Sequence, residues 1–288
     1  MKSIQIGRIL LILFICSMNL RGFSQNTLNV MTFNIRLDLA SDSVNAWQYR
    51  KDKAASQVLF HEADILGVQE ALHNQMMDLK QSMPGYEYTG GGREDGKTKG
   101  EYSAIFYNTK RLQLIKSSTF WLSLTPTIPG SKSWDAAITR IVTWAQFKDK
   151  QTGKTFFHFN THFDHMGKIA RKESALMVLK AVDSIAGKSI AIVTGDFNAI
   201  PSDEPIQTIV DANDPLKLTD TKPLSVEPHY GPTGTFNAFG PKETSNDPID
   251  YIFFNHGVKV LKHATLSQSW QGRFSSDHFP VWAKLQLQ

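Results

Sequence analysis

The stretch SIAIVTGDFN, residues 189–198, shows most directly how this chain folds. It begins with a nearly apolar run, 189–194, which is typical of a strand covered on both faces. Asp196 and Asn198 follow, two residues apart and therefore on the same side of an extended segment. In such sheets, ligands gather beyond the strand ends, where the backbone is free to present side chains. The stretch therefore predicts a buried strand that leads into a functional site.

The same pattern recurs on both sides of this stretch. Helical periodicity predicts helices at residues 47–60, 72–83 and 168–185. Strands and helices in this arrangement fit an α/β fold in which two packed sheets have helices outside them. The chain has no repeats and no Pro/Gly/Ser-rich linker, so residues 25–288 are predicted to be one domain. Seven more short apolar runs are expected to be strands: 29–35, 65–69, 103–107, 140–147, 154–160, 251–254 and 280–287.

Polar residues stand at the ends of several predicted strands. Asn34 lies near the end of the first, Glu70 follows the second, and His162 follows the run 154–160. These ends supply carboxylates, amides and imidazoles, but no thiol. Such groups suit the binding of a hard cation and the movement of protons on an oxygen substrate.

Residues 1–24 are predicted to be a secretory signal peptide. Lys2 and Arg8 precede the apolar run 9–16, and small residues precede a cleavage site after Ser24. The run is too short for a permanent membrane span, which needs about 20 residues. We therefore expect a secreted or periplasmic mature protein without a stable membrane span, in preference to an uncleaved anchor.

Removal of this segment changes what the composition indicates. The full chain has 31 basic and 27 acidic residues, and the loss of Lys2, Arg8 and Arg21 leaves 28 basic residues. Net charge then gives no argument for a polyanionic partner. The only cysteine, Cys16, is lost as well, and the residues before it match a lipoprotein signal poorly, so lipid anchoring is not favoured. A metal would need oxygen or imidazole ligands, which favours Mg²⁺, with Mn²⁺ or Ca²⁺ as alternatives.

Six strings stand out along the chain: MTFNIR (31–36), GVQE (67–70), NTHFDH (160–165), GDFN (195–198), PIDYIFF (248–254) and SSDHFPV (275–281). They resemble the ordered motifs of the endonuclease/exonuclease/phosphatase superfamily. One such string would be weak evidence, but six in the family's order are specific. Two further strings, STFWLSLTP (118–126) and SKSWDAAITR (131–140), resemble a secreted bacterial branch similar to the CCR4/nocturnin group.

The resemblance implies a four-layer α/β/β/α sandwich of two packed mixed sheets, the DNase I-like fold, with its site at one end. It also implies a divalent-metal-dependent hydrolase of phosphate esters. Asn34, Glu70 and Asp277 would hold the metal, which would bind a phosphate oxygen. Asp196 would accept a proton from the attacking water, and Asn198 would orient that water or a phosphate oxygen.

Two histidines complete the implied catalytic set. His278 would contact the phosphate, while Asp250 would fix its tautomer and favour its protonated form. His162 would be a second donor to the phosphate or the leaving group, and Glu101 is predicted to pair with His162. Taken singly, these residues have ordinary alternatives: Glu70 could stabilise the start of a helix, and GDFN could be a plain turn.

A further set of side chains is predicted to contact the substrate. Guanidinium groups match phosphate oxygens, and tryptophans could stack on a base or a sugar. The alternatives are solvated arginines, tryptophans packed in the core, and a structural Asp–His pair. The set consists of Arg140, Arg171, Glu101, Asp164, His165, Trp121 and Trp134.

The motifs leave three functions open. The leading hypothesis is a phosphodiesterase of nucleic acid or nucleotides, most similar to nucleases and 3′–5′ exonucleases. The alternative is a phosphatase or phospholipase C-type hydrolase of small or lipid phosphate esters, such as inositol phosphates, sugar phosphates or sphingomyelin. The third, a binding protein that has lost catalysis, is disfavoured because the set of site residues is intact. The near-neutral mature charge weakens the version that binds long polymers. We expect a monomer.

Overall fold

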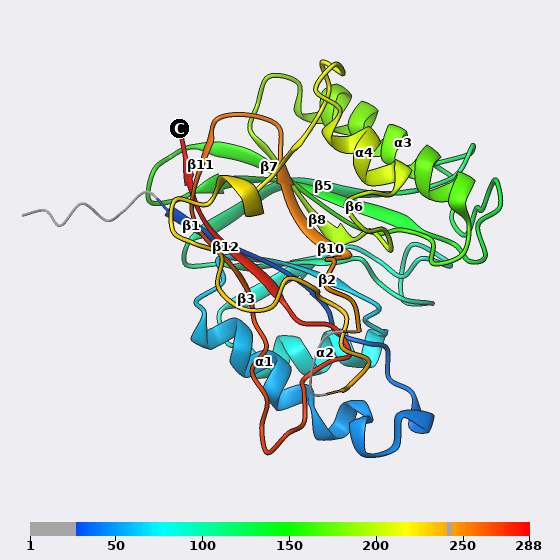
Figure 1. Cartoon of the computed structure of the whole chain (residues 1–288), viewed down its shortest axis with the longest axis vertical. Helices are drawn as coiled ribbons and strands as arrows, with labels where there is room; N and C mark the ends of the chain where they lie inside the picture. The colour runs from blue at the N-terminus through cyan, green and yellow to red at the C-terminus, as the bar shows by residue number, and fades with distance from the viewer. Residues whose placement is uncertain (1–26, 241–243) are drawn as a thin grey trace, which may run out of the picture.

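The computed structural model describes residues 27–240 and 244–288 (Figure 1). The predicted signal peptide and Cys16 lie outside these residues. Within them, every helix is too short or too polar to cross a membrane.

Two six-stranded mixed sheets form the centre of the molecule. In the first, β1 runs parallel to β2 and antiparallel to β12. In the second, β7 runs parallel to β8, and β10 pairs with β8 in the antiparallel sense. The first sheet has the order β11 (Val258–Thr265), β12 (Val281–Leu287), β1 (Thr27–Asn34), β2 (Ile65–Gln69), β4 (Ile105–Asn108), β3 (Tyr86–Thr89). The second has the order β5 (Leu112–Trp121), β6 (Ile141–Asp149), β7 (Thr155–His162), β8 (Ala191–Asp196), β10 (Asp250–Phe254), β9 (Thr219–Asp220).

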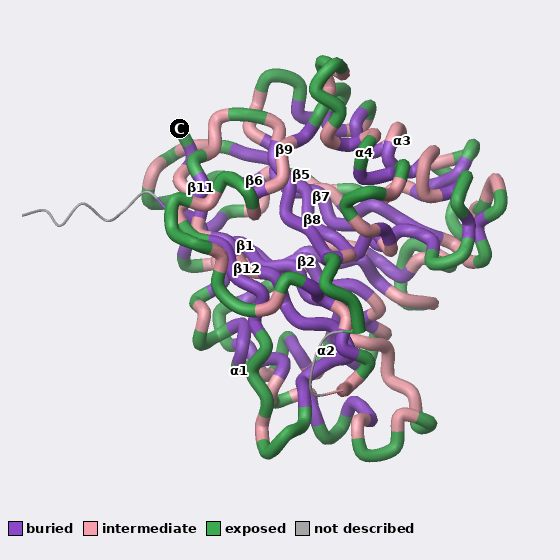
Figure 2. The backbone as a smooth tube through the Cα atoms, in the orientation of Figure 1, coloured by how far each residue is buried: buried purple, intermediate pink, exposed green. Residues whose placement is uncertain are grey.

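Helices cover the outer face of each sheet (Figure 1). The helices α1 (Lys51–Phe60) and α2 (His73–Ser82) pack on the first sheet through Val58 and Leu79. The helices α3 (Lys168–Ala186) and α4 (Glu204–Val210) pack on the second through Leu179 and Ile206. A third apolar cluster lies between the sheets, where the backbone is buried in Figure 2. Three cores between four layers confirm the predicted α/β/β/α sandwich.

Short 3₁₀ segments complete the elements. They are Ala40–Asn45, Trp47–Tyr49 and Lys222–Leu224. The predicted helix at 47–60 is therefore two pieces, a 3₁₀ turn and α1, separated at Arg50. The other two predicted helices and all eight predicted strands are present, with ends shifted by up to two residues.

Polar side chains tie the sheets together near their centre. Asn160 on β7 donates to the carbonyls of Val68 and Ala104 in the first sheet, both at 2.9 Å. Its Oδ1 accepts from Gln69 Nε2 at 2.7 Å. Gly67 makes this approach possible, because a Cβ there would lie 2.3 Å from Asn160 Oδ1. The two sheets are thus held in one register by hydrogen bonds as well as by apolar packing.

Candidate active site

The predicted catalytic and metal-binding residues meet at one end of the sandwich because of the strand directions. Asn34, His162 and Asp196 are the last residues of β1, β7 and β8, and Glu70 follows β2. Asp250 is the first residue of β10, which runs antiparallel to β8. The loop before β12, which is antiparallel to β1, brings Asp277 and His278 to the same end. These seven residues therefore form one site.

Asn34 joins the two sheets at this end. Its Nδ2 donates to Glu70 Oε1 at 3.0 Å and to Asp196 Oδ2 at 2.9 Å. The two carboxylates share one nitrogen, so they lie close enough for one hydrated ion. Backbone geometry helps to present Glu70, which has a φ of 62°. A non-glycine residue in this left-handed region is uncommon and marks a backbone held by its surroundings.

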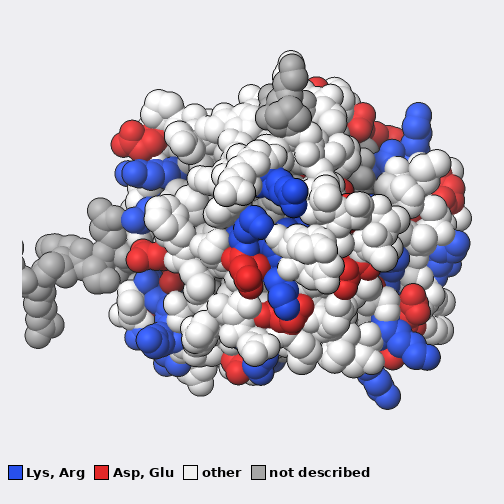
Figure 3. All heavy atoms as spheres, turned by 90° about the horizontal axis from the view of Figure 1, so that it is seen from below, with Lys and Arg blue, Asp and Glu red and all other residues white. Residues whose placement is uncertain are grey.

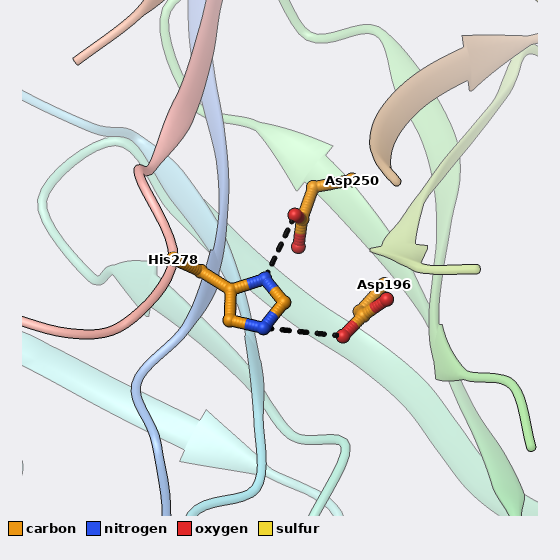
Figure 4. A group of neighbouring side chains, drawn as sticks. All are labelled: Asp196, Asp250 and His278. Atoms are coloured by element: carbon orange, nitrogen blue, oxygen red, sulfur yellow. Dashed lines mark hydrogen bonds and ion pairs between the residues drawn. The ribbon is translucent and has the colours of Figure 1, made fainter. Parts of the chain in front are cut away.

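Figure 4 shows His278 between two carboxylates. Its Nδ1 donates to Asp250 Oδ2 at 2.9 Å, and its Nε2 lies 3.8 Å from Asp196 Oδ2. Burial alone would lower the pKa of His278, but Asp250 and Asp196 raise it well above the usual range. The imidazolium is therefore the favoured form at neutral pH, as expected for a group that contacts a phosphate. Thr235 also donates to Asp250 Oδ2, at 2.6 Å.

Asp196 and His162 have shifted pKa values in the buried part of the site. Burial, with the nearby charge of Asp250, raises the pKa of Asp196 to about 7. Burial, with the positive charges of Arg140 and His278, holds the pKa of His162 well below its usual range. His162 Nε2 lies 3.3 Å from Asp196 Oδ2. A neutral imidazole thus lies beside a carboxyl group that titrates near neutrality, which suits proton transfer.

Asn198 lies beside Asp196, but through a turn and not along the extended segment that its spacing predicts. Its Nδ2 lies 3.0 Å from His162 Nε2, to which it donates when Nε2 carries no proton. Its backbone N–H donates to Asp196 Oδ1 at 2.9 Å. The φ of 47° at Asn198 turns the chain sharply after β8, a conformation that asparagine tolerates better than most residues. The GDFN segment is therefore a turn that presents two side chains.

The chemistry of the donors fits a hard divalent ion. Glu70 and Asp277 supply carboxylates, the ligands that Mg²⁺ prefers together with water, and the carboxylate of Asp196, the predicted base, lies beside that of Glu70. Burial raises the pKa of Asp277, as expected for acids gathered where a cation would offset their charge. Asn34 departs from its predicted role in one respect. Its Oδ1 accepts the N–H of Arg36 at 3.0 Å, so its amide would have to turn over to ligate a metal through oxygen.

A second grouping of possible ligands lies beside the first. One ligand atom each from Asp196, Asp250 and His278 lies within 4.8 Å of the others. We favour the first grouping, around Glu70 and Asp277, as the metal site, because His278 Nδ1 is already bonded to Asp250.

Two of the predicted substrate contacts lie together beside His162. Arg140 is buried, and its Nη2 is 3.3 Å from Nδ1 of the exposed His165. Among the described residues its Nε has no hydrogen-bond partner. The charge of Arg140 lowers the pKa of His162, and the charge of Asp196 raises the pKa of Arg140, which indicates that Arg140 interacts with the centre of the site.

Asp164 has a structural position, contrary to the predicted substrate contact. Its Oδ1 accepts the N–H groups of Met166 and Gly167, and its Oδ2 accepts those of Ala137 and Ile138. These bonds saturate the buried carboxylate. Burial would raise the pKa of Asp164, but the backbone N–H groups lower it.

Arg171 also supports this turn. Its Nη1 donates to the carbonyl of Asp164 at 2.9 Å. That bond uses one side of the guanidinium, and the side chain is half-buried.

The predicted pairing of Glu101 with His162 is wrong. Glu101 Oε2 instead accepts from Arg93 Nη1 at 2.6 Å. Stacking of Trp121 on a substrate is also contradicted, because this side chain is 4% exposed and its Nε1 donates to the carbonyl of Arg93. Its ring packs against Gly96 instead. Trp134 is half-buried, and its contact with a substrate stays a prediction.

Two arginines near the site are absent from the predicted set. Arg93, in the glycine-rich loop after β3, contributes positive charge that lowers the pKa of His162. Arg36 lies 3.7 Å from Asp277 Oδ2 through its Nε. Arg36 belongs to the MTFNIR string and could have been found there, whereas no motif marks Arg93.

Known proteins share this architecture along nearly the whole chain. An endonuclease/exonuclease/phosphatase from Bacteroides vulgatus is 40% identical, with a TM-score of 0.86 over 91% of this chain and 99% of its own. A mannosyl-6-phosphatase from Bacteroides thetaiotaomicron is 39% identical, with a TM-score of 0.84 over 90% and 99%. The human nocturnin catalytic domain is 22% identical, with a TM-score of 0.70 over 92% and 96%, which shows a shared fold. Residues 31–278 match the family as a whole, so the chain belongs to the endonuclease/exonuclease/phosphatase family.

Proposed function

We propose that this chain is a metal-dependent phosphatase of small polar phosphate monoesters, with sugar phosphates as the first class to test. The observation that carries the proposal is the convergence of Asp196, His162 and a protonated His278 within one buried site. The choice of substrate class rests on the 39% identical mannosyl-6-phosphatase, which aligns over nearly its full length.

The site residues suggest a division of labour. Asp196, once ionised, would accept a proton from the attacking water, with Asn198 beside it to orient that water. His278, held in its charged form by Asp250, would donate to a phosphate oxygen. Glu70 and Asp277, with Asn34, would hold the metal. When bound, a divalent ion supplies positive charge that offsets the charge developing on the phosphate oxygens.

Nucleic acid is the alternative substrate class. The similarity to nocturnin supports only the fold. On the face in Figure 3, Lys and Arg side chains lie next to Asp and Glu side chains. This mixture of charge gives little support for a track that binds a long polyanion, because such tracks gather basic residues. A phosphodiesterase of short nucleotides would need no such track and could use the same catalytic residues.

A substrate screen separates these functions. Purified residues 25–288 would be assayed with Mg²⁺, Mn²⁺, Ca²⁺ or EDTA against mannose 6-phosphate, glucose 6-phosphate, inositol phosphates, nucleotides, single-stranded RNA and DNA, and sphingomyelin. We expect metal-dependent release of phosphate from the sugar phosphates, which Asp196→Asn abolishes and moderate salt changes little. Cleavage confined to RNA or DNA, falling steeply between 50 and 200 mM salt as expected for polymer binding, would favour a nuclease. Inertness toward every ester would favour a binding protein.

A further inference from the structure

Arg50 connects two of the segments that form the site. Its side chain is 2% exposed. Nη1 donates to the carbonyl of Ile35 and, at 3.2 Å, to that of Ser275. Nη2 donates to the carbonyls of Arg36 and Leu37 at 2.7 and 3.3 Å. The guanidinium therefore binds the chain just after β1 and the loop before β12 at the same time.

The remaining contacts of Arg50 hold its plane in place. Nε donates to the carbonyl of Asn45 at 2.8 Å. The guanidinium carbon lies 5.0 Å from the ring centroid of Trp47 and 5.7 Å from that of Phe239. Burial lowers the pKa of Arg50 to about 10, which still leaves it charged at neutral pH. A lysine has three donors and no planar fork, so it cannot reproduce this set of bonds.

The first of the two segments leads directly to the predicted metal ligands. Asn34 immediately precedes it, and the N–H of Arg36 donates to Asn34 Oδ1 at 3.0 Å. The N–H of Leu37 donates to Glu70 Oε2 at 3.2 Å. A shift of these backbone groups would therefore move both Asn34 and Glu70.

The second segment leads to the phosphate side of the site. Ser275 is followed by Ser276, Asp277 and His278. Ser276 Oγ donates to the carbonyl of Asn34 at 2.7 Å, next to the bonds of Arg50. The spacing between Glu70 and Asp277 thus depends on what joins these two segments.

We propose that Arg50 is a positioning residue that sets the distance between Asn34 and Glu70 on one side and Asp277 and His278 on the other. Through this distance it controls the affinity for the divalent ion and, given the proposed function, the rate of turnover. Residues that orient metal ligands from outside have effects of about 10- to 100-fold on affinity or activity. A purely structural arginine would affect the stability of the fold and leave both quantities unchanged.

Arg50→Lys tests this proposal against a matched control, Arg111→Lys. Arg111 is also a buried arginine, and it forms two 2.8 Å bonds with Asp149. Asp149 ends β6 beside the start of β7, at the end of the sandwich away from His162. Each variant would be titrated with MnCl₂ and MgCl₂ by calorimetry, melted thermally, and assayed on the substrate identified for the wild type.

We expect Arg50→Lys to bind the ions at least about 10-fold more weakly, with a fall in kcat of similar size. Arg111→Lys should lower Tm and leave the dissociation constants and kcat unchanged. Wild-type values of both quantities in folded Arg50→Lys would overturn the proposal, and so would a wild-type protein that binds neither ion. If Arg50→Lys does not fold, Phe239→Leu, which removes one of the rings beside the guanidinium, should weaken ion binding several-fold, and unchanged binding there would overturn the proposal.

Calorimetry needs no substrate. A wild type that binds the ion and hydrolyses no ester would therefore refute the proposed function while still testing Arg50.

Discussion

Three ionisable side chains at the centre of the site differ in charge although all three are buried. The pKa of Asp196 is raised to about 7, that of His162 is lowered, and that of His278 is raised. Burial disfavours the charged form of each, and it is the leading cause of the shifts in the pKa values of Asp196 and His162. At His162 the positive charges of Arg140 and His278 add to burial, whereas at His278 the carboxylates of Asp250 and Asp196 outweigh it. One site can therefore hold a neutral and a charged imidazole together.

Asp196→Asn tests the proposed base. The substitution keeps the size of the side chain and removes its ability to accept a proton, so kcat should fall at least about 100-fold. Circular dichroism should show an unchanged fold. A kcat within twofold of the wild type, in excess Mg²⁺ and on the substrate found in the screen, would exclude Asp196 as the base.

The same substitution has a pH signature in metal-free protein. A folded-state pKa raised above the ordinary value of about 3.9 means that Asp196 favours folding at low pH and opposes it as pH rises through about 7. Asp196→Asn should therefore gain stability relative to the wild type between pH 4 and pH 8. Thermal melts in EDTA measure this difference. A gap in Tm that stays constant with pH would contradict it.

Asp250→Asn should lower the pKa of His278. The carboxylate at 2.9 Å is the leading charge that favours the imidazolium. An amide in its place can still occupy the same position, but it brings no negative charge. A ¹⁵N NMR titration of the histidine rings would measure the change. An unaltered His278 titration would show that Asp196 alone holds the charge.

At the scale of elements, the strands that the sequence did not reveal have one property in common. β3, β5, β9 and β11 are the four edge strands of the two sheets. β5 is buried only at its two ends, and β11 includes Lys259 and Lys262. Central strands are covered on both faces and paired on both sides, so they read as continuous apolar runs that predict a strand. Edge strands lack such runs, so the pattern does not mark them.

Asp164 shows what a single side chain does for two elements. It binds the backbone of residues 137–138, before β6, to residues 166–167, where α3 begins. Asp164→Asn leaves part of this set unsatisfied and should destabilise the protein by about 1–3 kcal/mol. Urea unfolding measures the change. Asp183→Asn, on the exposed side of α3, is the control and should change stability by less than about 0.5 kcal/mol. Equal effects of the two substitutions would refute the proposed clamp.

For the whole molecule, the ordered motifs were enough to predict the four layers and the eight residues of the site. The sequence could not show which polar atoms form hydrogen bonds with one another. The Asn34 amide, for example, takes its orientation from the Arg36 backbone. It also could not show that Arg93 binds Glu101, because that contact depends on how the glycine-rich loop folds back on itself. Such contacts depend on packing between distant segments, which periodicity does not record.

A bound metal should stabilise the whole fold. An ion that binds only the folded state adds about 2.7 kcal/mol at a concentration 100 times its dissociation constant. Tm of the wild type should therefore rise with Mg²⁺ or Mn²⁺. Glu70→Gln, which removes a charged ligand, should need much more of the ion for the same rise. Coincident titration curves for the two proteins would argue against Glu70 as a ligand.

We also propose that the chain is exported and cleaved after Ser24. Mass spectrometry of the protein from the exported fraction should then give a chain that begins at Gln25. A protein that retains residues 1–24 would indicate an anchor instead.

Each sheet supplies only half of the site. Glu70 and Asn34 come from the first sheet, and Asp196 and His162 come from the second. A folding intermediate with one sheet formed, or with both formed and not yet docked, would therefore be inert. During refolding, recovery of turnover would report the moment at which the two halves join, later than the recovery of strand and helix signals. The rate at which turnover recovers would thus measure how fast the two sheets dock.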